Sequence, residues 1–139
     1  MSRKAKLFEL MGKREAIALR RKAQSLTKIE AERATHDALC EKLAQMQADN
    51  APGAGLMHPR TLYAKSWYSG KLQSQREMTE ERVNFLQREA DGIRQTMTYL
   101  QRKGDILTQK TYAAKAEAQQ EAEEKAQSLM PPRQNRGIL

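Results

Sequence analysis

Three residues in the first half of the chain have side chains of the types that coordinate metal ions in proteins. Glu32, His36 and Cys40 follow one another at intervals of four residues, so a helix would place them along one face. Carboxylate, imidazole and thiolate groups all bind zinc, but a structural zinc site usually takes four ligands. Because His58 is the only other histidine, the set is incomplete. We predict no metal and no other cofactor.

The glycine-rich segment Ala51-Pro52-Gly53-Ala54-Gly55 resembles a phosphate-binding loop only in its glycines. Such a loop ends in Gly-Lys-Ser/Thr, which supplies a lysine and a hydroxyl group to phosphate and metal. Here Leu56, Met57 and His58 follow, so we interpret the segment as a turn. Neighbouring carboxylates such as Glu123 and Glu124 would need a cleft to shift their pKa values. We predict neither an enzyme nor a small-molecule substrate.

The elements that carry these residues are divided by two breaks, Ala51–Gly55 with Pro59 just beyond, and Pro131-Pro132. Proline and glycine end helices, and nearly everything between the breaks is a good helix former. The sequence predicts one domain, residues 1–139. It consists of a helix over about residues 3–48, a loop over about 49–59, a helix over about 60–129 and a flexible tail over 130–139.

The second helix carries a narrow stripe whose members are spaced by three and four residues, as a coiled coil requires. Its members are Leu62, Lys65, Ser69, Leu72, Arg76, Thr79, Val83, Leu86, Ala90, Ile93, Met97, Leu100, Gly104, Leu107, Thr111, Ala114 and Ala118. The first helix has a weaker stripe of Leu19, Lys22, Leu26, Ile29, Arg33, His36, Cys40 and Leu43. We predict a coiled-coil core of Leu19, Leu26, Ile29, Val83, Leu86, Ile93, Met97 and Leu100.

A stripe this narrow can be buried only against another helix, and a short loop makes the two helices antiparallel neighbours. The sequence therefore predicts an all-α fold, an antiparallel two-helix coiled-coil hairpin with a C-terminally extended second helix. A symmetric hairpin would place Leu43 near Lys65, and Gly12 near Met97. Helix 2 would then project about five turns beyond helix 1, and a partner is expected to receive this projection.

The chain has a formal net charge of +8, from 25 Lys and Arg against 17 Asp and Glu. This charge fits an acidic protein, nucleic acid or an anionic membrane surface. The basic start has little aromatic character for base stacking, so we prefer an acidic protein to nucleic acid. Membrane contact through Leu7, Phe8, Leu10 and Met11 is an alternative, although glutamates interrupt the pattern. With one cysteine, no signal peptide and no apolar span, the expected location is the cytoplasm.

An aromatic cluster follows the loop: Tyr63, Trp67 and Tyr68 lie between Leu62 and Leu72. A thin pair of helices cannot bury all five side chains in one stripe. The aromatic residues either anchor a protein interface or cover the loop and the end of helix 1 near Leu43 and Met46. The sequence leaves both possibilities open.

The whole chain resembles the FliJ family of flagellar export proteins. The resemblance lies in the basic start, the Gln-rich end of helix 1 (EKLAQMQADN), the short loop, the aromatic-led helix 2 (TLYAKSWYSGKLQ) and the long polar coiled coil. It implies a component of flagellar type III protein export, and so of flagellum biogenesis, motility and chemotaxis. Such a protein is a stalk that binds the hexameric export ATPase and promotes ring assembly and activity. The stalk also links the ATPase to the membrane export gate and to export chaperones.

The resemblance also implies where these partners bind, in the cytoplasm at the periphery of the inner membrane. The ATPase surface would comprise Lys6, Lys13, Arg14, Arg20, Arg21, Glu117, Glu121 and Glu124. The export-gate surface would comprise Leu39, Leu43, Met46, Tyr68 and Leu72. Tyr68 and Leu72 match the family's aromatic followed four residues later by leucine, although Gly70 between them is a poor helix residue. The alternatives are a homologous stalk of a virulence secretion system and a generic basic adaptor or nucleic-acid-binding protein.

Overall fold

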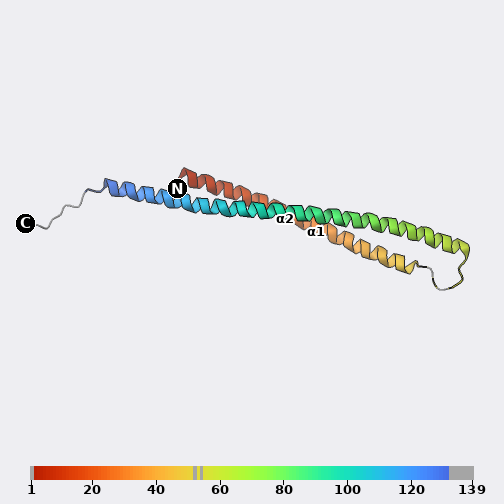
Figure 1. The fold of residues 1–139 in the computed structure, drawn as a ribbon. Coiled ribbons are helices and arrows are strands. Elements are labelled where there is room, and N and C mark those ends of the chain that lie inside the picture. Colours follow the sequence, from red (N-terminus) through yellow and green to blue (C-terminus); the bar gives the residue numbers. More distant parts are fainter. Residues whose placement is uncertain (1, 52, 54, 132–139) are drawn as a thin grey trace, which may run out of the picture. The chain divides into compact units, whose positions relative to one another are not determined.

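The computed structural model describes residues 2–51, 53 and 55–131, and these residues form two long helices. Helix α1 comprises Arg3–Asp49 and helix α2 comprises Pro59–Leu129 (Figure 1). No strand occurs in the described part of the chain. The predicted all-α fold with two mutually packed helices is therefore confirmed. Most of the predicted tail, from residue 132 onward, lies outside the described residues.

Local signals in the sequence set the starts of both helices. The hydroxyl group of Ser2 accepts a hydrogen bond from the backbone N–H of Ala5 at 3.1 Å, which caps the first turn of α1. Pro59 occupies the first position of α2, where its missing N–H costs no hydrogen bond. At the other end of α1, the side-chain amide of Asn50 donates to the backbone carbonyl of Lys65 at 2.9 Å.

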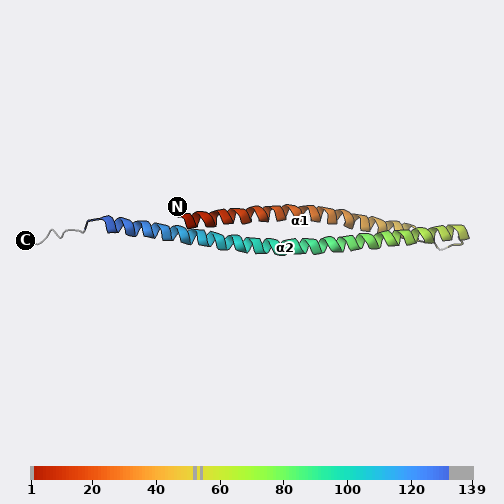
Figure 2. The ribbon, with the colours of Figure 1, turned by 90° about the horizontal axis from the view of Figure 1, so that it is seen from above.

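The chain divides into two compact units, and each contains a segment of both helices. Unit 1 comprises Met1–Arg20 and Thr98–Leu139, and unit 2 comprises Arg21–Met97. Within each unit the two segments lie side by side and run in opposite directions (Figures 1 and 2). Each unit is therefore an antiparallel pair of helices.

In unit 1, the pairing of the helices differs from the symmetric hairpin. A Cβ built on Gly12 lies 4.0 Å from the Cβ of Leu107, which is ten residues, or about three turns, beyond Met97. Near the start of α1, the ammonium group of Lys4 lies 4.0 Å from the carboxylate of Glu117. The predicted contact of Gly12 with Met97 is therefore wrong. Only about three turns of α2 follow Glu117, instead of the five expected beyond the start of α1.

Unit 2 shows a similar difference. Asn50, and not Leu43, reaches Lys65, and Gln47 donates to Gln73 at 2.9 Å. The turns of α2 that precede Lys65 therefore lie beyond the end of α1, as Figure 1 shows for the first turns of α2. The predicted contact of Leu43 with Lys65 is therefore wrong, because the residue level with Lys65 lies seven positions later, at Asn50.

The stripe of α2 is the side that the structure buries. Leu72, Thr79, Leu86, Ala90, Leu107 and Ala114 are buried, and the remaining members from Lys65 to Ala118 are half-buried. On α1, Leu43 is buried and Leu19, Leu26 and Ile29 are half-buried. Two stripe positions are exceptions. Leu62 is 48% exposed because it lies in the part of α2 that extends beyond the end of α1. Lys22 is exposed, whereas the neighbouring Ala23 is half-buried.

Candidate partner-binding surfaces

A buried carboxylate in unit 1 joins the two helices. Only 6% of the Glu15 side chain is exposed, and its Oε1 lies 3.1 Å from the Nζ of Lys103 and 3.2 Å from an Nη of Arg14. The hydrogen bond from Lys103 lowers the pKa of Glu15 more than burial raises it, and Arg14 adds to the decrease. Glu15 therefore carries its charge at neutral pH and holds α1 to Lys103 of α2.

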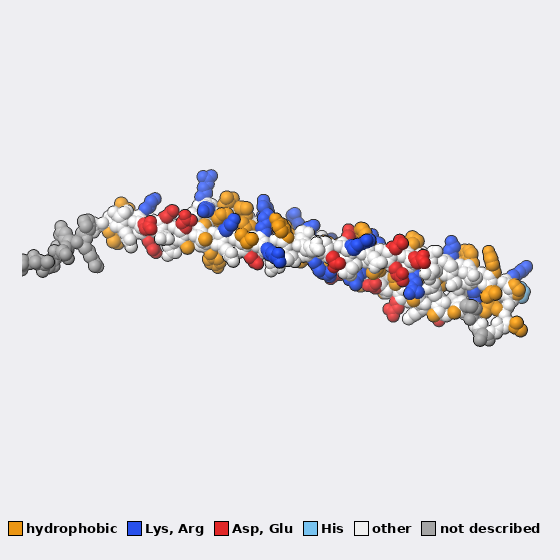
Figure 3. Space-filling view, in the orientation of Figure 1, with side chains coloured by type: hydrophobic (Ala, Val, Ile, Leu, Met, Phe, Trp, Pro, Cys, Tyr) orange, Lys and Arg blue, Asp and Glu red, His pale blue; other side chains and the backbone are white. Residues whose placement is uncertain are grey.

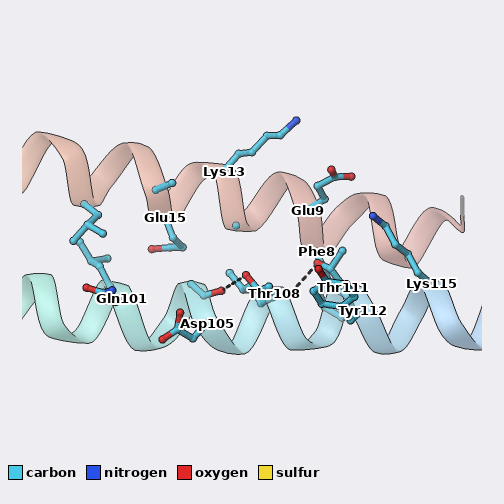
Figure 4. A pocket seen from close by; sticks show the side chains of 16 residues that line it. Phe8, Glu9, Lys13, Glu15, Gln101, Asp105, Thr108, Thr111, Tyr112 and Lys115 are labelled. Carbon is cyan, nitrogen blue, oxygen red and sulfur yellow. Dashed lines mark hydrogen bonds between the residues drawn. The ribbon is translucent and has the colours of Figure 1, made fainter.

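A groove of about 490 Å³ runs along one side of unit 1 (Figure 4). Its bottom contains Gly12 and Gly104, which leave space where larger stripe residues would meet, together with Leu19, Leu100 and Leu107. In Figure 4, Glu15 points from α1 toward α2, whereas Lys13 extends away from α2. The groove is a consequence of small residues in the stripe, and its rim carries both signs of charge.

The basic residues predicted to bind the ATPase lie on the exposed surface of α1. Lys6, Lys13, Arg14 and Arg20 are exposed members of unit 1, and the first, second and fourth follow one another every seven residues. They therefore form a row along one side of the helix. Arg21 is exposed too, but it belongs to unit 2.

The acidic residues predicted for the same surface lie on α2 of unit 1. Glu117 is paired with Lys4, so the structure brings the basic start of α1 and this part of α2 together. Glu121 and Glu124 follow and are exposed. In Figure 3, acidic side chains gather on α2 just past the start of α1, and basic and hydrophobic side chains lie next to one another over the paired helices.

The residues predicted to bind the export gate all belong to unit 2, but they are not equally accessible. Leu43 and Leu72 are only 6% and 5% exposed, because they fill the space between the helices. Leu39 and Tyr68 are 37% and 39% exposed, and Met46 is half-buried. A partner can therefore reach Leu39 and Tyr68 directly, whereas Leu43 and Leu72 support the packing beneath them.

The aromatic residues at the start of α2 form a second exposed group, which the predicted gate surface did not include. Tyr63 is 75% exposed and Trp67 is 58% exposed, with the ammonium group of Lys71 at 5.5 Å from the centroid of the Trp67 ring. The aromatic cluster in the sequence was the signal for this group. Its exposure favours the interface interpretation over the covering of α1.

The residues considered for zinc are engaged otherwise. Glu32 accepts a hydrogen bond from Arg82 at 2.8 Å and lies 3.7 Å from His36. The bond from Arg82 lowers the pKa of Glu32, and burial raises the pKa of Cys40, assisted by the charges of Glu80 and Asp37. Among the described residues, no group of three His, Cys, Asp or Glu side chains is arranged to hold a metal ion.

Two arginines lie within the otherwise largely apolar stripes, Arg76 on α2 and Arg33 on α1. Arg76 donates hydrogen bonds to Glu80 at 3.1 Å and to Gln47 of α1 at 3.2 Å. Arg33 pairs with Asp37 on its own helix at 3.7 Å. Each arginine therefore has a carboxylate within its own helix.

Neither helix contains, among its described residues, a stretch long and apolar enough to cross a membrane. Comparison of the chain with family models, with curated proteins and with solved structures finds no match. Any functional conclusion therefore depends on the residues and geometry described above.

Proposed function

We propose that the chain is the coiled-coil stalk of a bacterial type III protein export apparatus, most specifically the flagellar one. In this proposal it acts in the cytoplasm at the periphery of the inner membrane. It binds the hexameric export ATPase, promotes assembly and activity of the ring, and connects the ring to the export gate and export chaperones. The proposal assigns no catalytic activity to the chain.

The observation that carries the proposal is the arrangement of charge in unit 1. The basic start of α1 lies beside α2, as the Lys4–Glu117 ion pair shows, and α2 continues for about three turns with Glu121 and Glu124 exposed. A paired, basic end with a projecting single helix suits insertion into a ring with a charged inner surface. A projecting helix of three turns is marginal alone in water and would be stabilised by such a partner.

The exposed residues of unit 2 support the second contact. Leu39 and Tyr68 are accessible, and Tyr, Trp and Arg are the residue types that most often dominate interfaces. In the proposal, Tyr68 and Leu39 touch the gate, and Leu43 and Leu72 hold them in position. Alanine at Leu39 and Tyr68 should weaken capture of the gate protein while leaving helix content unchanged.

The test of the ATPase contact is a hydrolysis assay with the purified export ATPase of the same organism. The full chain should raise the ATPase rate and elute with the ring. The double variant Arg20→Glu with Arg21→Glu should lower this stimulation severalfold, because exposed charges steer association more than they stabilise the fold. The matched control is Arg88→Glu with Arg102→Glu, which makes the same charge change at exposed positions of α2.

An unchanged hydrolysis rate together with separate elution would reject the stalk role. Equal loss in both double variants would show that net charge, and not the basic surface of α1, governs the effect. Circular dichroism of each variant checks that the helices remain intact.

A further inference from the structure

The part of α1 in unit 1 carries two stripes on nearly opposite sides. The inner stripe faces α2 and consists of Ala5, Phe8, Gly12, Glu15 and Leu19. Four other residues each follow an inner residue by two positions, and we name them the outer stripe: Leu7, Leu10, Arg14 and Ile17. Two residues of an α-helix span about 200°, so the outer stripe points away from α2.

The outer stripe is exposed although three of its four members are aliphatic. Leu7 is 56% exposed, Leu10 is 61% exposed and Ile17 is 52% exposed. Their spacing of three and seven residues places them in one line instead of scattering them. Single exposed leucines need no explanation, but a line of them on one helix face does.

The charge around this line has one dominant sign. Lys13 and Arg20 follow Leu10 and Ile17 by three residues and are therefore their neighbours on the helix surface. Arg14 lies within the stripe, with 68% of its side chain exposed. The outer stripe is thus an aliphatic line bordered and interrupted by exposed cations.

The glutamates of this segment do not interrupt the outer stripe. Glu15 belongs to the inner stripe and is paired with Lys103, and Glu9 lines the groove between the helices. Pairing with α2 removes Glu15 from the outer stripe, whereas Glu9 precedes Lys13 by four residues and lies beside it at the border of the stripe. No glutamate therefore lies within the outer stripe itself.

We propose that the outer stripe binds the surface of an anionic lipid membrane. Helices that lie in a membrane interface combine aliphatic residues on one face with flanking Lys and Arg, which meet the lipid headgroups. Leu7, Leu10 and Ile17 enter the boundary between headgroups and acyl chains, and Lys6, Lys13, Arg14 and Arg20 meet the headgroup phosphates. This inference does not depend on the proposed export function, but it uses four cations that the export proposal assigns to the ATPase, so the membrane and the ATPase would compete for this face of α1.

A lipid surface fits better than the other two anionic partners. A partner helix would also cover a stripe spaced by three and four residues, but it would bury Arg14 within the contact, whereas at a lipid surface the long arginine side chain reaches the headgroups. Nucleic acid would use the cations but gains nothing from exposed aliphatic side chains, and the outer stripe holds no aromatic ring for base stacking. Lipid uses both features and requires no matching shape.

The test is flotation of the full chain with vesicles. One vesicle type contains equal parts of phosphatidylcholine and phosphatidylglycerol, and the other contains phosphatidylcholine alone. We expect binding to the anionic vesicles only, and weaker binding at high salt. The double variant Leu10→Gln with Ile17→Gln should bind at least about tenfold less, because two aliphatic side chains no longer leave water.

The matched control is Ile106→Gln, since Ile106 is also 52% exposed in unit 1 but lies on α2. It should bind anionic vesicles like the unchanged chain, and circular dichroism should show equal helix content for all variants. Equal binding of the Leu10 and Ile17 variant would show attraction by charge alone and would overturn the proposal. Absence of vesicle binding would overturn it too, and binding of duplex DNA in that case would identify nucleic acid as the anionic partner.

Discussion

Lys103 on α2 and Glu15 on α1 form the most buried ion pair between the helices of unit 1, with 3.1 Å between nitrogen and oxygen. Glu15 belongs to the inner stripe of α1, where an apolar residue is usual, and only 6% of its side chain is exposed. A charge in this position is tolerated because Lys103 and Arg14 supply its partners. The pair also helps to fix which residues of the two helices lie level.

The first prediction concerns the dependence of stability on pH. The folded-state pKa of Glu15 lies below its usual value of 4.5, so its charged form stabilises the fold above that pH. This stabilisation is lost as the pH falls from 4.5 through the lower, folded-state value. Replacing Glu15 with Gln should lower the unfolding temperature at neutral pH, and the difference from the unchanged chain should shrink in acid. Thermal unfolding followed by circular dichroism measures both.

Glu9→Gln is the control for this prediction, because Glu9 is half-buried in the same segment and lies at the groove. It should change the unfolding temperature less at neutral pH. If the effect of Glu15→Gln were the same at every pH, its charge would not be the stabilising feature.

The second prediction concerns the register of unit 1. The Cβ–Cβ distance of 4.0 Å between position 12 and Leu107 is suitable for a disulfide. With Cys40 replaced by Ser, the pair Gly12→Cys and Leu107→Cys should form an intramolecular disulfide under mild oxidation. The pair Gly12→Cys and Met97→Cys should not form a disulfide, since Met97 lies ten residues before Leu107 on α2. Faster migration on a non-reducing gel reports the bond, and a reversed outcome would restore the symmetric hairpin.

The third prediction concerns packing in unit 2. Leu86 is fully buried, so Leu86→Ala should lower the free energy of unfolding by about 2–5 kcal/mol. Met78→Ala, at a position that is 65% exposed, should change it by no more than about 0.5 kcal/mol. Urea unfolding with an unchanged m-value gives both quantities. Similar effects of the two variants would place Leu86 outside the core.

The fourth prediction concerns the reactivity of Cys40. Burial raises the pKa of its thiol, so less of the reactive thiolate is present at neutral pH. Cys40 should react more slowly with a thiol-specific disulfide reagent than a cysteine at the exposed position 38, introduced as Ala38→Cys with Cys40→Ser. Raising the pH should accelerate the reaction of Cys40. A faster reaction of Cys40 at neutral pH would contradict its burial.

The fold was predictable because spacing decides which side of a helix is buried. Every stripe residue of α2 from Lys65 to Ala118 is buried or half-buried, and only Leu62 and Lys22 differ among the positions named for the two stripes. The register was not predictable, because a repeating pattern fits equally well after a shift of whole turns. Individual pairs select among the shifts, as Glu32 with Arg82 and Glu15 with Lys103 do.

The accessible surfaces were predictable only in part, because the exposure of a side chain depends on how the two helices pair. Leu43, Leu72 and Leu39 are all leucines, yet only the first two are buried, because burial is decided by the neighbouring helix and not by the residue type. The role of Glu15 likewise follows from Lys103, which is remote from it in sequence. Residue type suggests what could bind, and the pairing of helices decides what is free to do so.

The only tryptophan of the chain is Trp67, which is 58% exposed near the end of α1 in unit 2. Its fluorescence therefore reports on that one locality, with no second indole to blur the signal. A blue shift of its emission would mean that a partner has removed the indole from water, whereas changes confined to unit 1 would leave the emission wavelength unaltered.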